Sequence, residues 1–268
     1  MFTEALIDIL LTSTILISNQ NYISSNFSFG LSSSNYLYKE YNDNGKVIDS
    51  ETADDLYNFS LSYGKQFTPK HSLKLSLNYL FGVFTYDGST WSGTPITYNT
   101  YNNYLINILT NYKYTQPINN SYTIKYNLGI GYRLWARGYD ENNPNDYREY
   151  YKWFYASTGI DNIIKITNNI DSNIFIKYNQ AINPTLKVML GNNPTLNLGN
   201  THGIDFGINV KFLNTQRQGF MLGYKYTYWH SNKSNSETLV LNNQNTQIYE
   251  PESDSKLQTI SFEYFLSY

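Results

Sequence analysis

The strongest constraint in this sequence is a strict alternation of apolar and polar residues over positions 122–134. Every even position is apolar or aromatic: Tyr122, Ile124, Tyr126, Leu128, Ile130, Tyr132 and Leu134. The odd positions between them hold Thr, Lys, Asn, Gly or Arg. A period of two indicates a β-strand with one apolar and one polar face. The segment is longer than the ~5–6 residues of an ordinary strand and satisfies the ~9–11 residues that a strand needs to cross a bilayer.

The same alternation recurs along the chain, and we count ten such strands. The segments that join them alternate in length. The longer ones are residues 42–53, 87–98, 138–148, 183–193 and 231–255, and the shorter ones are 68–71, 116–120, 167–172 and 213–218. This arrangement is typical of extracellular loops and periplasmic turns, with both termini on the periplasmic side. We therefore predict an all-β fold, a transmembrane antiparallel up-and-down β-barrel of ten strands.

The composition agrees with a barrel and excludes several other classes. The mean hydropathy is −0.48, and no run of ~18 apolar residues is present to form a spanning helix. Lipid-facing and lumen-facing residues alternate in a barrel, so its average hydropathy is low. The chain has no cysteine, which excludes disulfides, thiolate metal sites and cysteine nucleophiles. The net charge of −2 gives no basic footprint for nucleic acid.

The N-terminal segment differs from the rest. Residues 5–18 form an apolar run, but Glu4 and Asp8 stand where a secretory signal has basic residues, and no clear cleavage site follows. We divide the chain into residues 1–25, a signal-like or N-terminal periplasmic segment, and residues 26–268, a single outer-membrane barrel domain.

The inward face of the strands is basic. Its predicted lumen-lining charges are Lys74, Lys113, Lys125, Arg133, Asp161, Lys165, Lys177, Asp205, Lys211, Lys225 and Glu263. One interpretation is a lumen that attracts anions. The interpretation we favour is that ten strands leave little open bore, so these charges form a paired, hydrated plug. In either case each of the three acids is expected to find a partner.

The outer loops have the opposite sign, with acids clustered in the first, third and fifth. Such a rim attracts cations or basic peptides, or it simply remains solvated. Of the histidines, His202 lies three residues before Asp205, and His230 ends a strand. A general base requires proximity in space rather than in sequence, so a pairing of His230 with a loop acid stays open. We predict no catalytic residues, no metal site and no cofactor.

The last strand carries apolar residues at every second position and ends the chain on an aromatic one: Ile260, Phe262, Tyr264, Leu266 and Tyr268. This pattern resembles the C-terminal assembly signal of bacterial outer-membrane β-barrels, with Phe262, Tyr264, Leu266 and Tyr268 as its residues. The resemblance implies partners in the barrel assembly machinery and in outer-membrane lipid and lipopolysaccharide. It also implies a Gram-negative outer-membrane location. The final strand is expected to close the barrel against residues 27–31.

Strand number, topology and length together resemble the omptin group of ten-stranded outer-membrane proteases. Those proteases use an aspartate pair and an Asp-x-His pair at the outer rim, and no Asp-x-His occurs here. We therefore expect a monomeric, non-enzymatic barrel that acts as a narrow pore or as a surface-exposed structural or interaction protein. The alternative is an omptin-like protease or another rim hydrolase.

Overall fold

The structure is a computed structural model that describes residues 24–89, 93–139, 146–215, 217–241 and 243–268. Almost all of the predicted signal-like segment, residues 1–25, lies outside the described residues. No helix in the described part of the chain has the length and apolar character needed to cross a membrane.

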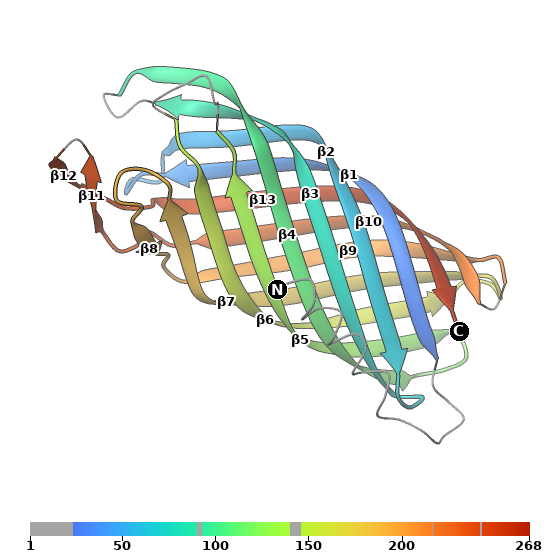
Figure 1. Cartoon of the computed structure of the whole chain (residues 1–268). Coiled ribbons are helices and arrows are strands. Elements are labelled where there is room, and N and C mark those ends of the chain that lie inside the picture. Colours follow the sequence, from blue (N-terminus) through green and yellow to red (C-terminus); the bar gives the residue numbers. More distant parts are fainter. Residues whose placement is uncertain (1–23, 90–92, 140–145, 216, 242) are drawn as a thin grey trace.

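Ten long strands form one closed antiparallel barrel, which confirms the predicted fold class. They are β1 (Ser25–Tyr41), β2 (Val47–Gln66), β3 (His71–Ser89), β4 (Pro95–Pro117), β5 (Tyr122–Arg137), β6 (Glu149–Lys165), β7 (Ile170–Val188), β9 (Thr201–Leu213), β10 (Gln218–Ser231) and β13 (Glu252–Ser267). The short β8 (Thr195–Asn197) pairs with β7, and β11 (Glu237–Leu241) with β12 (Gln244–Ile248) forms a separate hairpin. This hairpin lies at the opposite end of the barrel from the C-terminus (Figure 1).

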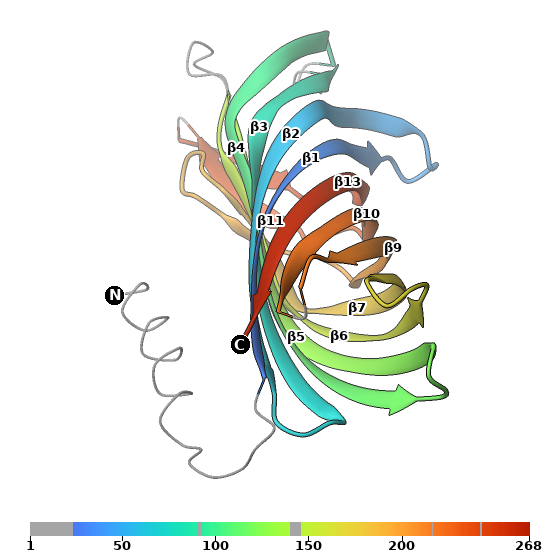
Figure 2. The ribbon, with the colours of Figure 1, turned by 90° about the vertical axis from the view of Figure 1, so that its right-hand side faces the viewer.

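The barrel closes where the last strand meets the first. Strand β13 lies between β1 and β10 (Figure 2). Phe27 faces Leu266 and Leu31 faces Phe262 across the β1–β13 pair. This is the seam expected from the sequence.

Several strands continue into segments that were expected to be loops. The first connection is residues 42–46 rather than 42–53, β4 begins at Pro95, and β7 continues to Val188. Above the apolar belt the outward face of a strand also carries polar residues, so the backbone ladder continues without alternation of apolar and polar side chains. Ser50 opposite Asp87 is one such pair. Hydrophobic alternation therefore marks only the lower part of each strand.

The outer surface carries the apolar residues, as membrane-crossing strands require. Leu128 is 64% exposed and Ile130 is 67% exposed. The outward face of other strands presents Phe29 on β1, Ile176 on β7 and Ile260 on β13.

An aromatic layer fills the barrel interior. Its members are Tyr36, Tyr38, Trp135, Tyr151, Trp153, Tyr155 and Trp229, all buried. The Trp135 and Tyr151 rings stack at 4.9 Å, and the Trp153 and Trp229 rings lie edge to face at 5.2 Å. A Cβ at Gly131 would overlap the Tyr155 ring, so only glycine admits this ring beside β5. Two small cavities, of about 30 and 20 Å³, lie beside these side chains.

Candidate functional site at the outer mouth of the barrel

A cavity of about 750 Å³ lies at the end of the barrel where the β11–β12 hairpin projects. Along β5 the inward positions run from Lys125 through Arg133 and Trp135 to Arg137. The aromatic layer therefore lies between this cavity, which we call the vestibule, and the lysines further along the barrel interior. Its ionisable acidic and basic lining residues are Glu40, Asp49, Glu51, Arg137, Asp146, Glu149 and Glu250.

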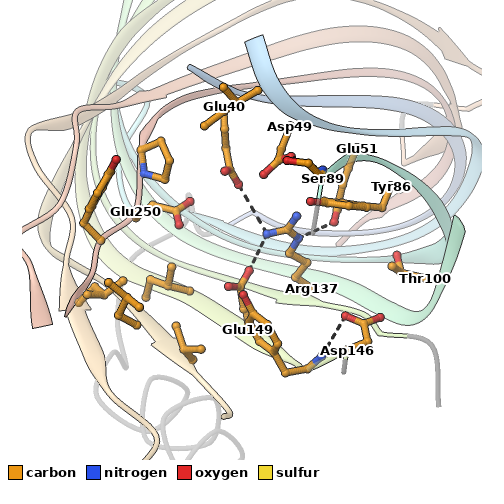
Figure 3. Close-up of a pocket in the computed structure, with 18 of the residues that line it drawn as sticks. Glu40, Asp49, Glu51, Tyr86, Ser89, Thr100, Arg137, Asp146, Glu149 and Glu250 are labelled. Carbon is orange, nitrogen blue, oxygen red and sulfur yellow. Dashed lines mark hydrogen bonds and ion pairs between the residues drawn. The ribbon is translucent and has the colours of Figure 1, made fainter. Parts of the chain in front are cut away.

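Arg137 is the centre of the charge cluster. It stands opposite Glu149 in the β5–β6 register, and its Nη1 lies 2.6 Å from Glu149 Oε2. Its Nε donates to Glu51, and Glu40 Oε1 lies 3.6 Å from Nη1. Figure 3 shows the three carboxylates arranged around this one guanidinium. The acids come from β1, β2 and β6, so the cluster joins three strands to the end of β5.

Glu250 lies apart from this ion-pair cluster. Its Oε1 accepts hydrogen bonds from the Tyr38 hydroxyl at 2.6 Å and the Tyr151 hydroxyl at 2.7 Å. Among the described residues no lysine or arginine forms an ion pair with it. Burial, with the nearby charge of Glu149, raises the pKa of Glu250 to about 7. Burial and the charge of Glu250 also raise the pKa of Glu40 well above its ordinary value.

The vestibule has unused capacity to bind a positive group. Its described lining residues carry six carboxyl groups and one guanidinium. Glu51 is 1% exposed, and its Oε2 has no hydrogen-bond partner among the described residues. A buried carboxylate oxygen without a partner is costly, so a cationic donor in the vestibule would be stabilised there. Within the described residues no group of three or more His, Asp or Glu side chains has the arrangement of a metal site.

The predicted lumen charges lie on the other side of the aromatic layer, apart from Arg133, which lies within it. Lys113 Nζ lies 2.7 Å from Asp161 Oδ2, with Lys125 opposite Asp161 in register. Arg133 is held between the rings of Trp153 and Trp229 at 5.7 and 5.6 Å. Two of the predicted lumen charges, Lys113 and Asp161, thus form an ion pair, and a third, Arg133, lies between two tryptophan rings.

The remaining predicted charges lie near one another along the inner wall, where Lys74 interacts electrostatically with Glu263 and Lys177 with Asp205. Asp205 accepts from Asn179 and Thr227, and Glu263 accepts from Ser28. The five lysines occupy separate inward register positions: Lys74 opposite Asn111, Lys165 opposite Asp171, Lys177 opposite Gly159, Lys211 opposite Met221 and Lys225 opposite Gly207. Asp161 forms an ion pair with Lys113, whereas the hydrogen-bond donors to Asp205 and Glu263 are neutral side chains.

The histidines lie outside the vestibule. His230 Nδ1 lies 2.9 Å from Asp254 Oδ1, and its Nε2 lies 2.9 Å from Asn232 Oδ1. His202 is the cross-strand partner of His230, with ring centroids 5.4 Å apart. Both share the outward parity of Tyr228, so this His–Asp pair faces away from the barrel interior. The sequence left open whether His230 pairs with an acid, and in the structure it pairs with Asp254.

Sequence reasoning did not identify the vestibule. Glu51 and Glu250 fall in the predicted loops 42–53 and 231–255, and the predicted site residues do not include Glu40, Arg137 or Glu149. The position of Glu40 and Arg137 in their strands could have identified them. Each occupies an inward-facing position of its strand, beyond the part in which apolar and polar residues alternate clearly. The predicted assembly residues Phe262, Tyr264, Leu266 and Tyr268 lie on the outward parity of β13 and its end, where Phe262 stacks on Phe220 at 5.3 Å.

Comparison with known proteins supports the fold alone. No family model and no curated protein sequence matches the chain. Among solved structures, the outer-membrane protease OmpT from Escherichia coli is similar at 13% identity and a TM-score of 0.62, covering 95% of this chain and 99% of that one. The attachment invasion locus protein Ail of Yersinia pestis matches at 10% identity and a TM-score of 0.30, covering 91% of this chain and 98% of that one. The chain therefore has the fold of an outer-membrane β-barrel, similar to that of the omptins.

Proposed function

We propose that the chain is a non-enzymatic outer-membrane surface protein that binds small organic cations in its extracellular vestibule. The observation that carries the proposal is a cavity of about 750 Å³ lined by six carboxyl groups and one guanidinium. Its volume is in the range of ~300–1,000 Å³ usual for small-molecule sites. A cleft of one charge sign with low-dielectric walls concentrates ions of the opposite sign.

The aromatic layer supports binding rather than passage. A solute that passes beyond the vestibule meets Trp135, Tyr151 and Trp229, and the cavity among these rings is only about 20 Å³. Water-filled lumens belong to barrels with more strands, whereas small barrels are filled by side chains. The proposal therefore selects a surface interaction protein over a narrow pore.

The surroundings of the barrel follow from its outer face. We propose a monomer in the outer membrane, with lipid and lipopolysaccharide against the apolar belt and the barrel assembly machinery recognising the C-terminal strand. The exposed apolar parity over all ten strands supports contact with lipid.

Binding is tested by calorimetric titration of the full chain in lipid nanodiscs with methylguanidinium chloride. We expect a dissociation constant of about 1 mM and a several-fold loss of affinity in Glu250→Gln. The matched control is Glu237→Gln, which removes an acid from β11 outside the vestibule lining and should leave affinity unchanged. Absence of binding, or equal weakening by both variants, overturns the proposal.

A rim hydrolase remains the second candidate because of one observation, the hydrogen bond between His230 and Asp254. Its test is hydrolysis of a dibasic peptide by the full chain and by His230→Ala. Turnover that disappears in His230→Ala would favour the hydrolase. No turnover in the unmodified protein would leave the His–Asp pair a structural feature of the outer wall.

A further inference from the structure

The vestibule has two chemically different walls. The carboxylates that surround Arg137 come from β1, β2 and β6. Another part of the lining is apolar and comes mostly from β7, β8 and the segment from β11 to β13. It comprises Leu186, Val188, Leu196, Leu239, Ile248 and Pro251. Ile248 and Pro251 are half-buried, while the other four are buried.

The apolar wall is held in place by specific contacts. Leu239 of the β11–β12 hairpin is 1% exposed. Asn192, in the turn after β7, donates its Nδ2 to the Thr238 carbonyl at 3.1 Å and accepts from the Val240 backbone N–H at 2.9 Å. Gly191 has a positive φ of 56°, and a Cβ there would overlap the Val240 carbonyl. The hairpin is thus docked on the β7–β8 turn, so the wall is formed before any ligand arrives.

The two walls meet at Glu250. This residue is two positions after Ile248 and immediately before Pro251 in the chain. The Tyr38 and Tyr151 hydroxyls fix its Oε1, and Arg137 already pairs with one carboxylate oxygen of Glu51 and one of Glu149. When the cationic group of a ligand binds Glu250, the substituent attached to that group therefore lies beside Ile248.

We infer that the preferred ligand is a small organic cation with an apolar substituent of about four to eight carbons, such as an alkylguanidinium or alkylammonium ion. The inference rests on the proposed function and adds the ligand class. The head pairs with Glu250, and the substituent covers Ile248 and Pro251. Burial of apolar surface is favourable in proportion to area, so affinity rises with the length of the substituent. Charge complementarity excludes the corresponding anions.

The test compares methyl-, butyl- and hexylguanidinium by calorimetry in nanodiscs, with empty nanodiscs as the blank. We expect affinity to increase about two- to fourfold per methylene group. Hexyl sulfate should not bind. Ile248→Ser should reduce the increase per methylene while leaving methylguanidinium binding unchanged. The matched control is Val240→Ser, an exposed apolar position of the same hairpin outside the vestibule lining.

The outcomes separate the two proposals. If methylguanidinium binds but chain length adds nothing, or if Ile248→Ser keeps the same increase per methylene, the inference fails and the cation site stands. If hexyl sulfate binds as well as hexylguanidinium, an unspecific apolar site explains the data and the inference fails. If methylguanidinium itself does not bind, the proposed function fails first.

Discussion

Arg137 and Glu149 face each other across the β5–β6 pair, with Nη1 2.6 Å from Oε2. The same guanidinium also pairs with Glu51 and Glu40, so one arginine links acids that come from three strands. The arrangement leaves Glu250 without a cation among the described residues. The ion pairs of Arg137 with Glu40, Glu51 and Glu149 hold the strands of the vestibule together. Glu250, which has no such ion pair within the described residues, is available to bind a cation.

Replacing Arg137 by Met should destabilise the outer end of the barrel. Glu51 is 1% exposed, and breaking a buried ion pair by removing one partner costs about 3–5 kcal/mol. The measurement is urea unfolding followed by the heat-modifiable gel shift. Adding Glu51→Gln to Arg137→Met should restore part of the loss, since it removes a stranded charge. A single variant as stable as the parent would contradict this account of the cluster.

Cation binding should strengthen with pH around neutrality. Glu250, whose pKa burial raises to about 7, is mostly neutral at pH 6 and mostly ionised at pH 8. Methylguanidinium affinity should increase up to about tenfold over that interval. Because the folded-state pKa is raised, the contribution of Glu250 to stability is present below its unfolded pKa and is lost as pH rises through about 7.

The control for this pH dependence is Glu250→Gln, which should bind more weakly with an affinity nearly constant between pH 6 and 8. Titration at fixed salt is required, because screening changes the same affinity. A pH profile that persists unchanged in Glu250→Gln would assign the titration to another group.

The fold could be predicted from the sequence because a membrane-crossing strand must alternate. Residues such as Leu128 and Ile130 face the outside, and their polar neighbours face the interior, so both strand number and the closing seam followed from parity. Strand ends could not be predicted in the same way. Above the belt, pairs such as Ser50 and Asp87 place polar residues on the outward face as well, and the alternation of apolar and polar residues that marks a strand is lost.

The site escaped prediction for a related reason. Arg137 pairs with Glu51, which is 86 positions away in sequence, and Glu250 contacts Tyr38 over 212 positions. Such proximities depend on register between strands and on how far each strand extends beyond the belt. Parity predicted a set of inward lysines, but it gave no account of the aromatic layer that lies between them and the acids of the vestibule.

The intact barrel should be electrically silent in planar-bilayer recordings. Trp229 stacks edge to face with Trp153, and Arg133 lies between these two rings. The double variant Arg133→Ala with Trp229→Ala removes the centre of the aromatic layer and should produce reproducible conductance steps. Phe206→Ala, on the outer face, is the control and should remain silent. Steps of equal size in the unmodified protein would show an open lumen.

Below the aromatic layer, Asp161 should matter more than Glu263. Asp161→Asn strands the ammonium group of Lys113, which lies 2.7 Å from the carboxylate, at a cost of about 3 kcal/mol. Glu263 accepts from the neutral Ser28 hydroxyl at 3.1 Å, so Glu263→Gln should cost about 1 kcal/mol. Parallel urea titrations of the two variants measure the difference, and the reverse order would show that the lysines depend on Glu263.

Deletion of Tyr268 should impair assembly in cells, and the structure offers two reasons. The Tyr268 backbone N–H donates to the Ser25 carbonyl at 2.9 Å, and the Ser25 N–H donates to the Tyr268 carbonyl at 2.8 Å. Tyr268→Ala keeps both seam hydrogen bonds and removes the aromatic ring. If the assembly machinery recognises the ring, Tyr268→Ala should reduce the level of heat-modifiable protein in outer-membrane fractions as much as the deletion does. Both variants should still refold from urea into detergent. If Tyr268→Ala assembles normally, the assembly defect of the deletion comes from the loss of the two backbone hydrogen bonds to Ser25.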